Sequence, residues 1–223
     1  GLSSQIMLGQ GVMARRIADV RAGLRVVAGA HARDPISVPV VLDEFPTAKK
    51  TRVAVMANPP GGTTHPGIEA AVRKAADALS NAGHDVVETT PPDFELACQL
   101  WSAQMNGELT LQIELLNMVM GEGGRQFLEL TREGMPEVDF AGWVDAQVQR
   151  NGVARRWSLW FQENPILICP TWTEPAFVYD YDVKDVESAM GTLQQLRAVL
   201  PANLLGLPAV VVPGGMADSL PVG

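Results

Sequence analysis

The segment from residue 52 to residue 88 constrains the fold most, because it alternates strand, helix and strand with short connections. Residues 52–57 form an apolar, partly β-branched run that stops at Pro59, which predicts a buried strand. After Pro66, apolar residues recur at spacings of four and three up to position 82, which predicts an amphipathic helix. Residues 84–88 form a second strand-like run. Such a unit places its two strands parallel and joins them by a right-handed crossover.

The remaining sequence continues this alternation. Helical spacing of apolar residues predicts helices over 13–27, over most of 93–161 with breaks at 121–124 and 134–136, and over 185–200. Pro136 is expected to open the last helix of the middle stretch. The side chains of that helix expected to face the core are Phe140, Trp143, Val144, Gln147, Val148 and Trp157. Further apolar runs at 164–169 and 207–213 predict strands.

These elements together predict an α/β fold. We expect a three-layer α/β/α sandwich with a mainly parallel or mixed central sheet, in which the runs 53–57, 165–169 and 209–212 lie side by side. Residues 1–223 are expected to form a single α/β domain. Within it, residues from about 93 to 161 form a mostly helical insertion.

Net charge, the length of apolar runs and the cysteine content indicate which partners and which cell compartment the chain can have. The chain carries 17 Lys and Arg against 25 Asp and Glu, a net charge of −8, which argues against a nucleic-acid or anionic-membrane partner. No apolar run approaches the roughly 18 residues of a membrane span, and no signal-peptide pattern is visible. Cys98 and Cys169 form neither a disulfide framework nor a zinc motif. We therefore expect a cytoplasmic protein.

No motif in the chain supplies an evident catalytic group. Ser3 and Ser4 have no lysine near them in sequence. Cys169 ends a buried strand, where a cysteine is either a ligand-facing group or an inert small apolar residue. The remaining histidines, glycine pairs and acidic residues match no metal, phosphate or calcium pattern: His31, His65, His84, Gly61–Gly62, Gly214–Gly215, Asp180, Asp182, Asp185 and Glu187. We predict no catalytic residue, no metal and no cofactor in this chain.

Several blocks nevertheless occur in a characteristic order. They are QGVMARRIAD at 10–19, RDP at 33–35, the HP and AGHDVV ends of 65–87, the stretch 161–177 with its PAF, and ANLLGLPA, PGG and LPVG between 202 and 223. Together these blocks resemble the amidase signature family over nearly the whole chain. Val12, Arg16 and Asn164 stand where that family commonly has proline, serine and aspartate.

This resemblance implies the second half of the amidase signature fold. The catalytic Ser–cis-Ser–Lys triad of the family lies upstream, on a strand lysine and a GGSSGG-like segment. That segment is not in this sequence, and no lysine precedes residue 49. We expect the C-terminal half of an amidase, a hydrolase of carboxylic amide C–N bonds, which is inactive alone. A non-catalytic amidase-like subunit or binding protein is the alternative. A third alternative is a ligand-binding α/β module unrelated to amidases. In that case the matches between these blocks and the family would have arisen by chance.

Three residues are candidates for contact with a small-molecule amide substrate. Ligands of α/β sheets meet the carboxyl ends of strands, and Trp172 follows such an end. Its ring either walls an acyl or aryl group or packs under the loop at 175–177. By the resemblance, Met7 and Gln10 follow the missing signature and are expected to border the pocket. An exposed sheet edge further predicts association, either as a homo-oligomer or with the missing N-terminal half.

Overall fold

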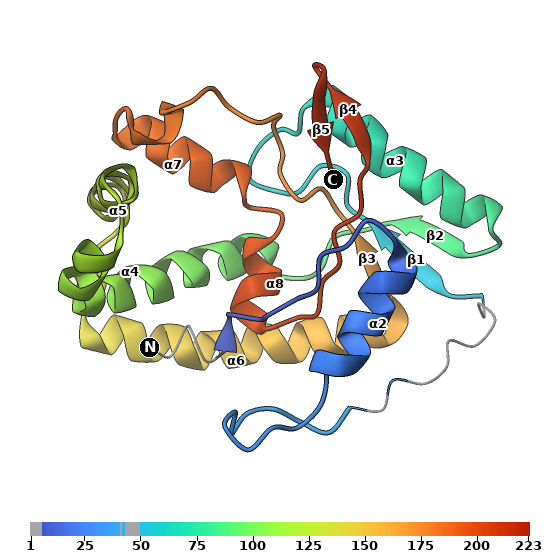
Figure 1. The fold of residues 1–223 in the computed structure, drawn as a ribbon, viewed down its shortest axis with the longest axis horizontal. Helices are drawn as coiled ribbons and strands as arrows, with labels where there is room; N and C mark the ends of the chain where they lie inside the picture. Colours follow the sequence, from blue (N-terminus) through green and yellow to red (C-terminus); the bar gives the residue numbers. More distant parts are fainter. Residues whose placement is uncertain (1–5, 41, 43–49) are drawn as a thin grey trace.

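The central feature is a three-stranded parallel sheet in the order β2-β1-β3 (Figure 1). The computed structural model describes residues 6–40, 42 and 50–223. Strand β1 (Arg52–Val55) pairs with β2 (Asp85–Glu88) and with β3 (Ile166–Ile168), so that Val53 lies opposite both Val86 and Ile166. Helix α3 (Pro66–Asn81) connects β1 to β2. The predicted strand–helix–strand unit is confirmed.

The two faces of β1 pack against different layers. Successive side chains of a strand point to opposite faces. Val55 and Ala57 therefore meet Val72 and Ala76 of α3, whereas Met56 joins a separate cluster on the other face. Every side chain from Val53 to Ala57 is at most 4% exposed. Full burial on both faces explains why this run is apolar without alternation.

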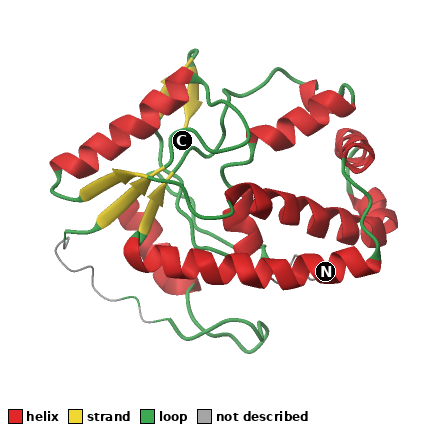
Figure 2. Ribbon diagram, turned by 180° about the vertical axis from the view of Figure 1, so that it is seen from behind, coloured by secondary structure: helices red, strands yellow, loops and turns green. Residues whose placement is uncertain are grey.

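The other face is covered by helices α4 (Phe94–Val119), α6 (Phe140–Glu163) and α8 (Leu200–Leu205). Met56 and these helices share one buried hydrophobic core. Its larger members from the helices are Phe94, Leu100, Val153, Trp157 and Leu204. Figure 2 shows the sheet between α3 and the long α6. The α/β fold with helices on both faces of a parallel sheet is confirmed.

The middle stretch is helical, as predicted, with breaks before and after α5 (Glu122–Gly134). The first break lies at 120–121 rather than at 121–124, because Gly123 and Gly124 belong to the first turn of α5. Two expectations for α6 are wrong. The helix begins at Phe140 and not at Pro136, because the Asp139 carboxylate accepts a hydrogen bond from the Gly142 N–H at 2.7 Å and so caps it. Phe140, Val144 and Val148 do not face the core, since they are 81%, 41% and 64% exposed.

The face of α6 that is buried carries Ala146, Val153 and Trp157. Apolar residues occur on both sides of this helix, so spacing alone does not select the buried one. The selection is made by packing: α4 and α8 both contact α6, and the Trp157 Nε1–H donates to the Pro92 carbonyl at 2.7 Å.

The strand predicted at 207–213 is wrong. The described residues contain no strand there, and Val210, Val211 and Val212 are 75%, 65% and 49% exposed. An extended segment becomes a strand only when a neighbouring strand pairs with it, and no described strand pairs with this one. The runs 53–57 and 165–169 share a sheet as predicted, but 209–212 does not join them.

The remaining elements lie around this framework. Helix α2 (Ile17–Val27) begins four residues later than predicted, and none of its residues is buried. The 3₁₀ helix η1 (Tyr181–Val183) precedes α7 (Val186–Gln195), which ends before the predicted boundary. Strands β4 (Gly215–Ala217) and β5 (Leu220–Val222) form an antiparallel hairpin. No helix within the described residues has the length and apolarity to span a membrane.

His65 connects α3 to the β4–β5 hairpin. Its Nδ1 accepts a hydrogen bond from the Gly67 N–H at 3.2 Å, and its Nε2 lies 3.2 Å from Asp218 Oδ2. We expect His65→Ala to lower the free energy of unfolding by about 1 kcal/mol through loss of the cap. Asp218→Ala should cost less, because Asp218 is 71% exposed. Urea denaturation of both variants tests this order, and the reverse order would contradict it.

Candidate functional site

The carboxyl ends of the three parallel strands lie at one edge of the sheet, where three segments are tied together. They are residues 56–65 after β1, residues 169–174 after β3, and the turn 194–198 between α7 and α8. The His65 N–H donates to the Thr173 carbonyl at 2.8 Å, and the Thr173 N–H donates to the Gln195 carbonyl at 3.0 Å. The edge is therefore a connected backbone framework.

Arg197 lies at the centre of this framework and is only 4% exposed. Its Nε donates to the Pro59 carbonyl at 3.2 Å, and its Nη2 donates to the Thr63 carbonyl at 2.6 Å. Its Nη1 donates to Thr173 Oγ1 at 2.9 Å and to the Gln194 carbonyl at 3.2 Å. Burial lowers the pKa of Arg197 from its ordinary value. Through the hydrogen bonds that it donates, the buried guanidinium connects residues 56–65, after β1, to residues 169–174, after β3.

The glycine pair at 61–62 accommodates this arginine. Gly61 has φ +91°, a conformation that favours glycine. A β-carbon at Gly62 would lie 3.2 Å from Arg197 Cζ, so the backbone passes directly over the guanidinium. In the sequence this pair suggests only a phosphate loop or a turn, and Arg197 does not stand out. The available signal is a lone arginine within the otherwise apolar run 196–200.

Trp172 lies at the edge, in a half-buried position. Its Nε1–H donates to Gln195 Oε1 at 2.8 Å. Its ring centroid is 6.1 Å from that of Phe177, which in turn lies 5.6 Å from that of Tyr181. The structure thus places Trp172 both at the strand end and against Phe177, so both predicted roles stay open.

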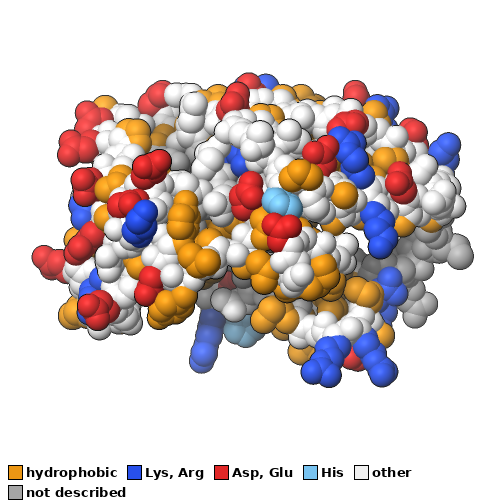
Figure 3. Space-filling view, turned by 90° about the horizontal axis from the view of Figure 1, so that it is seen from above, with side chains coloured by type: hydrophobic (Ala, Val, Ile, Leu, Met, Phe, Trp, Pro, Cys, Tyr) orange, Lys and Arg blue, Asp and Glu red, His pale blue; other side chains and the backbone are white. Residues whose placement is uncertain are grey.

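Phe177, which contacts the Trp172 ring, also lines a groove of about 570 Å³ beside α5. Its apolar lining includes Phe127, Phe177, Val178 and Val183, and Asp180 and Asp182 also line it. Figure 3 shows acidic side chains gathered at the end of the molecule that carries α5 and α7. Through Phe177, this groove is connected to a predicted site residue.

Met7 and Gln10 occupy a different part of the chain. Met7 is 9% exposed and packs in the core around Met56 and Leu204, and its carbonyl accepts from Asn203 Nδ2 at 2.8 Å. Gln10 is exposed. Met7 and Trp172 have separate sets of packing and hydrogen-bond partners. Their roles in substrate contact stay predictions.

Asn203 fixes where the N-terminal segment runs. The Trp101 Nε1–H donates to Asn203 Oδ1 at 2.7 Å, while the amide of Asn203 holds Met7. Gly206, with φ +66°, ends α8, and a β-carbon there would lie 2.9 Å from the Ile6 carbonyl oxygen. The predicted candidates Ser3 and Ser4 lie outside the described residues.

The other titratable candidates have local structural roles. His31 Nδ1 accepts from the Arg33 N–H within a tight turn, and His84 Nδ1 accepts from the Thr51 N–H. Asp185 caps α7 by accepting from the Ser188 N–H at 2.8 Å, and this hydrogen bond lowers its pKa. Within the part of the chain that the structure describes, no cluster of His, Cys, Asp or Glu could hold a metal ion.

Both cysteines are partly buried and pack against the core. Burial raises the pKa of Cys98 to about 12 and that of Cys169 to about 11. The Cys98 Sγ lies 3.6 Å from the Arg197 carbonyl, as a weak donor to it. Both thiols are therefore protonated near neutral pH, which is the state of an inert apolar cysteine rather than of a nucleophile.

We expect the native cysteines to react with iodoacetamide at pH 7.5 at least about 100-fold more slowly than in guanidinium, because thiolate is the reactive form. Folding raises both pKa values, so deprotonation favours the unfolded chain. Stability should accordingly fall as pH rises above about 9. Mass spectrometry of alkylation and urea titrations at pH 7, 9 and 10 measure these effects. Rapid labelling of Cys169 in the native chain would contradict the burial argument.

Comparison with known proteins identifies the family to which the chain belongs. The chain matches the Amidase family over residues 3–223. It is 32% identical to indoleacetamide hydrolase of Bradyrhizobium japonicum, covering 99% of this chain and 48% of that protein. It is 29% identical to 6-aminohexanoate-cyclic-dimer hydrolase of Paenarthrobacter ureafaciens, covering 96% of this chain and 48% of that one.

Solved structures share the fold. A bacterial aryl acylamidase superimposes with a TM-score of 0.70 at 19% identity, over 96% of this chain and 48% of that one. A 6-aminohexanoate cyclic dimer hydrolase superimposes with a TM-score of 0.66 at 22% identity, over 94% and 49%. The chain spans about half the length of the curated relatives it matches. The resemblance seen in the sequence blocks is confirmed, and the chain belongs to the Amidase family.

Proposed function

We propose that this chain is the C-terminal half of an amide hydrolase whose Ser–cis-Ser–Lys triad is carried by an upstream segment. The observation that carries the proposal is the family match over residues 3–223 together with the half-length coverage of the relatives. In this mechanism the lysine is the base, the bridging serine relays the proton, and the second serine attacks the amide carbon. Backbone N–H groups stabilise the resulting oxyanion.

This half contributes the floor and one wall of the substrate site. The framework around Arg197 holds the strand-end loops in fixed positions. Trp172 and Phe177 then wall the acyl or aryl part of a small amide, with the apolar groove beside Phe127 as its extension. Met7 and Gln10 border the pocket from the side of the upstream segment. An indole-sized acyl group, as in the name of the bradyrhizobial relative, is the first substrate to test.

The surface expected to meet the upstream half is the apolar face of α2 with the extended segment 210–212. Ile17, Leu24 and Val27 recur on one face of α2 and are 55%, 41% and 58% exposed. Val210 is 75% exposed on a segment that lacks a pairing strand among the described residues. A strand added beside 210–212 would satisfy its backbone and cover its side chains. The residues 1–223 thus form part of one larger domain, in the cytoplasm, where unpaired cysteines persist.

The longer parent protein tests this function. Purified parent should release ammonia from indole-3-acetamide, and replacing its upstream lysine or either triad serine should abolish release. Alanine at Trp172 should raise KM for the indole substrate more than for acetamide, because the smaller acyl group does not reach the ring. A folded parent without a triad and without amidase activity would instead support the non-catalytic subunit or binding protein.

A further inference from the structure

One face of helix α4 is buried along the first half of the helix and exposes apolar side chains along the second half. Positions 97, 104, 111 and 118 recur every seven residues and so lie on one face. Ala97 and Gln104 are 0% and 1% exposed, whereas Leu111 and Met118 are 86% and 76% exposed. Leu115, between them, is 56% exposed.

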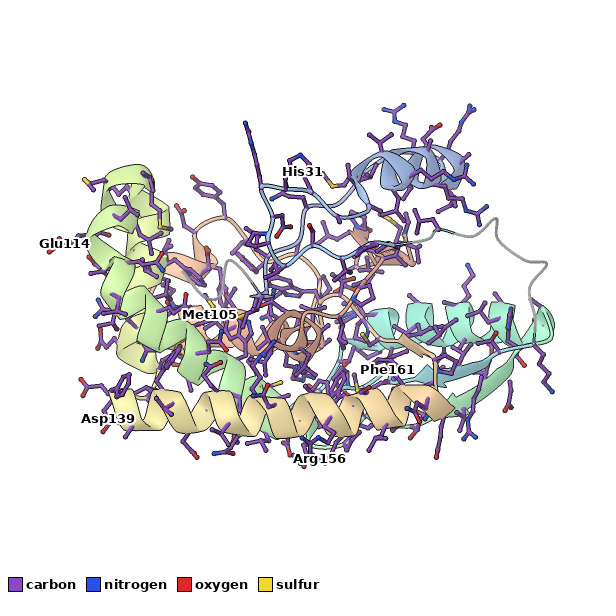
Figure 4. The ribbon with its side chains drawn as sticks, turned by 90° about the horizontal axis from the view of Figure 1, so that it is seen from below. His31, Met105, Glu114, Asp139, Arg156 and Phe161 are labelled. Atoms are coloured by element: carbon purple, nitrogen blue, oxygen red, sulfur yellow. The ribbon has the colours of Figure 1, made fainter. Side chains whose placement is uncertain are left out.

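The side chains on this face of α4 change from buried to exposed at the level where α6 begins. Gln147 Nε2 donates to Gln104 Oε1 at 3.2 Å, and a β-carbon at Gly107 would lie 2.6 Å from Trp143 Cδ1. The two helices therefore run antiparallel, and α6 begins at Phe140, close to the level of Leu111. Figure 4 shows Glu114 pointing away from the body at the free end of α4, the same end at which Asp139 precedes α6. Residues of α4 beyond Leu111 continue past α6, and no described helix lies over this face.

The open part of α4 is held in place. The Arg125 Nη1 donates to the Asn117 carbonyl at 3.3 Å and to the Met120 carbonyl at 2.9 Å, which satisfies the last turn of the helix from α5. A β-carbon at Gly124 would lie 2.9 Å from Met120 Cε, so the two helix ends are in contact. The exposed face is thus presented on a formed helix, already ordered for binding.

We propose that this face, made of Leu111, Leu115, Met118, Val119 and Phe140, binds the same face of a second copy of the chain. Val119 is 73% and Phe140 81% exposed. An aromatic side chain alone offers roughly 150–250 Å², so the five side chains offer several hundred Å² per copy. A standard interface buries about 800 Å² per partner, which this face and its rim approach.

The geometry favours a two-fold, antiparallel arrangement. The open stretch of α4 has Leu115 near its middle, so a two-fold axis there places Leu111 of one copy near Val119 of the other. The α4 helix of each copy would then cover the part of α4 in the other copy that extends beyond the start of α6. Glu114 and Asp139 are exposed at the rim. These carboxylates would face the headgroups of an anionic bilayer unfavourably, whereas at a protein interface they stay in water.

Cross-linking at the expected axis tests the proposal. In the intact protein, Leu115→Cys should give a covalent dimer with a short bismaleimide, since the two new thiols lie across the axis. Leu159→Cys is the matched control, because Leu159 is 57% exposed on α6 but lies far from the face. It should give no dimer above the background of the protein without a new cysteine. Equal cross-linking of both variants, or none at Leu115→Cys, would overturn the proposal.

A second measurement separates self-association from lipid binding. The mass from light scattering at tens of micromolar should be that of a dimer for the wild-type protein. The double variant Leu111→Lys, Met118→Lys should lose both this state and the Leu115→Cys cross-link, while circular dichroism and the unfolding midpoint stay unchanged. Leu159→Lys should keep the wild-type mass. A monomeric wild type that sediments with phosphatidylcholine vesicles, and loses that binding in the double variant, would replace the second copy by a membrane.

Discussion

The 223-residue chain alone is expected to hydrolyse no simple aryl or aliphatic amide above the uncatalysed rate. Amide hydrolysis at neutral pH needs an activated nucleophile and a stabilised oxyanion. The thiols of Cys98 and Cys169 are held protonated by burial. Removing a nucleophile and base that act together costs about six orders of magnitude in turnover. Ammonia release from indole-3-acetamide and benzamide, followed over hours, measures this.

Supplying the upstream segment, by fusion or co-folding, should restore turnover. In that restored enzyme Ser3→Ala, Ser4→Ala and Cys169→Ala should each stay within a few-fold of the unmodified protein. Activity of the bare chain that disappears on Ser4→Ala or Cys169→Ala would reveal a nucleophile in this half and refute the proposed division of roles.

Replacing Arg197 is expected to give the largest loss of stability of any single polar substitution at the strand edge. In Arg197→Met the Pro59 and Thr63 carbonyls and Thr173 Oγ1 lose their buried donor, and each unsatisfied group costs about 1–3 kcal/mol. Relief of the desolvated charge offsets part of this cost, so we expect a net loss of about 3 kcal/mol. Urea denaturation of the intact protein measures the change.

Two controls separate the network from charge. Arg197→Lys keeps the charge but cannot donate in four directions, so it should lose nearly as much stability as methionine. Arg155→Met, on the exposed face of α6, should change the free energy of unfolding by less than about 0.5 kcal/mol. If Arg197→Met were as stable as Arg155→Met, the guanidinium would not be what holds the loops.

Short-range patterns in the sequence predict much of the fold. The strand–helix–strand unit at 52–88 and the breaks flanking α5 follow from periodicity, proline and glycine, which act within a few residues. The buried face of α6 does not follow from spacing, because apolar residues occur on both of its sides and α4 decides between them. The segment 207–213 resembles a strand because it is apolar, but pairing depends on a neighbour and not on composition.

The site is harder to predict for the same reason. Trp172 can be proposed as a site residue because it follows a strand, which is a local signal. Arg197 cannot, since its acceptors lie at Pro59, Thr63 and Thr173, far away in sequence. A lone arginine in an apolar stretch gives no indication of which backbone carbonyls it will meet.

The strand order has a consequence for how the chain folds. β1 meets β2 only about 30 residues later, but it meets β3 more than 100 residues later. Closing the longer loop adds only about 1 kcal/mol of chain entropy, yet such distant pairings are slow to form. The antiparallel α4 and α6 bring the chain back toward its starting point before β3 arrives. Pairing of α4 with α6 would therefore shorten the loop that remains to be closed, and we expect β1–β2 pairing to precede the pairing of β1 with β3.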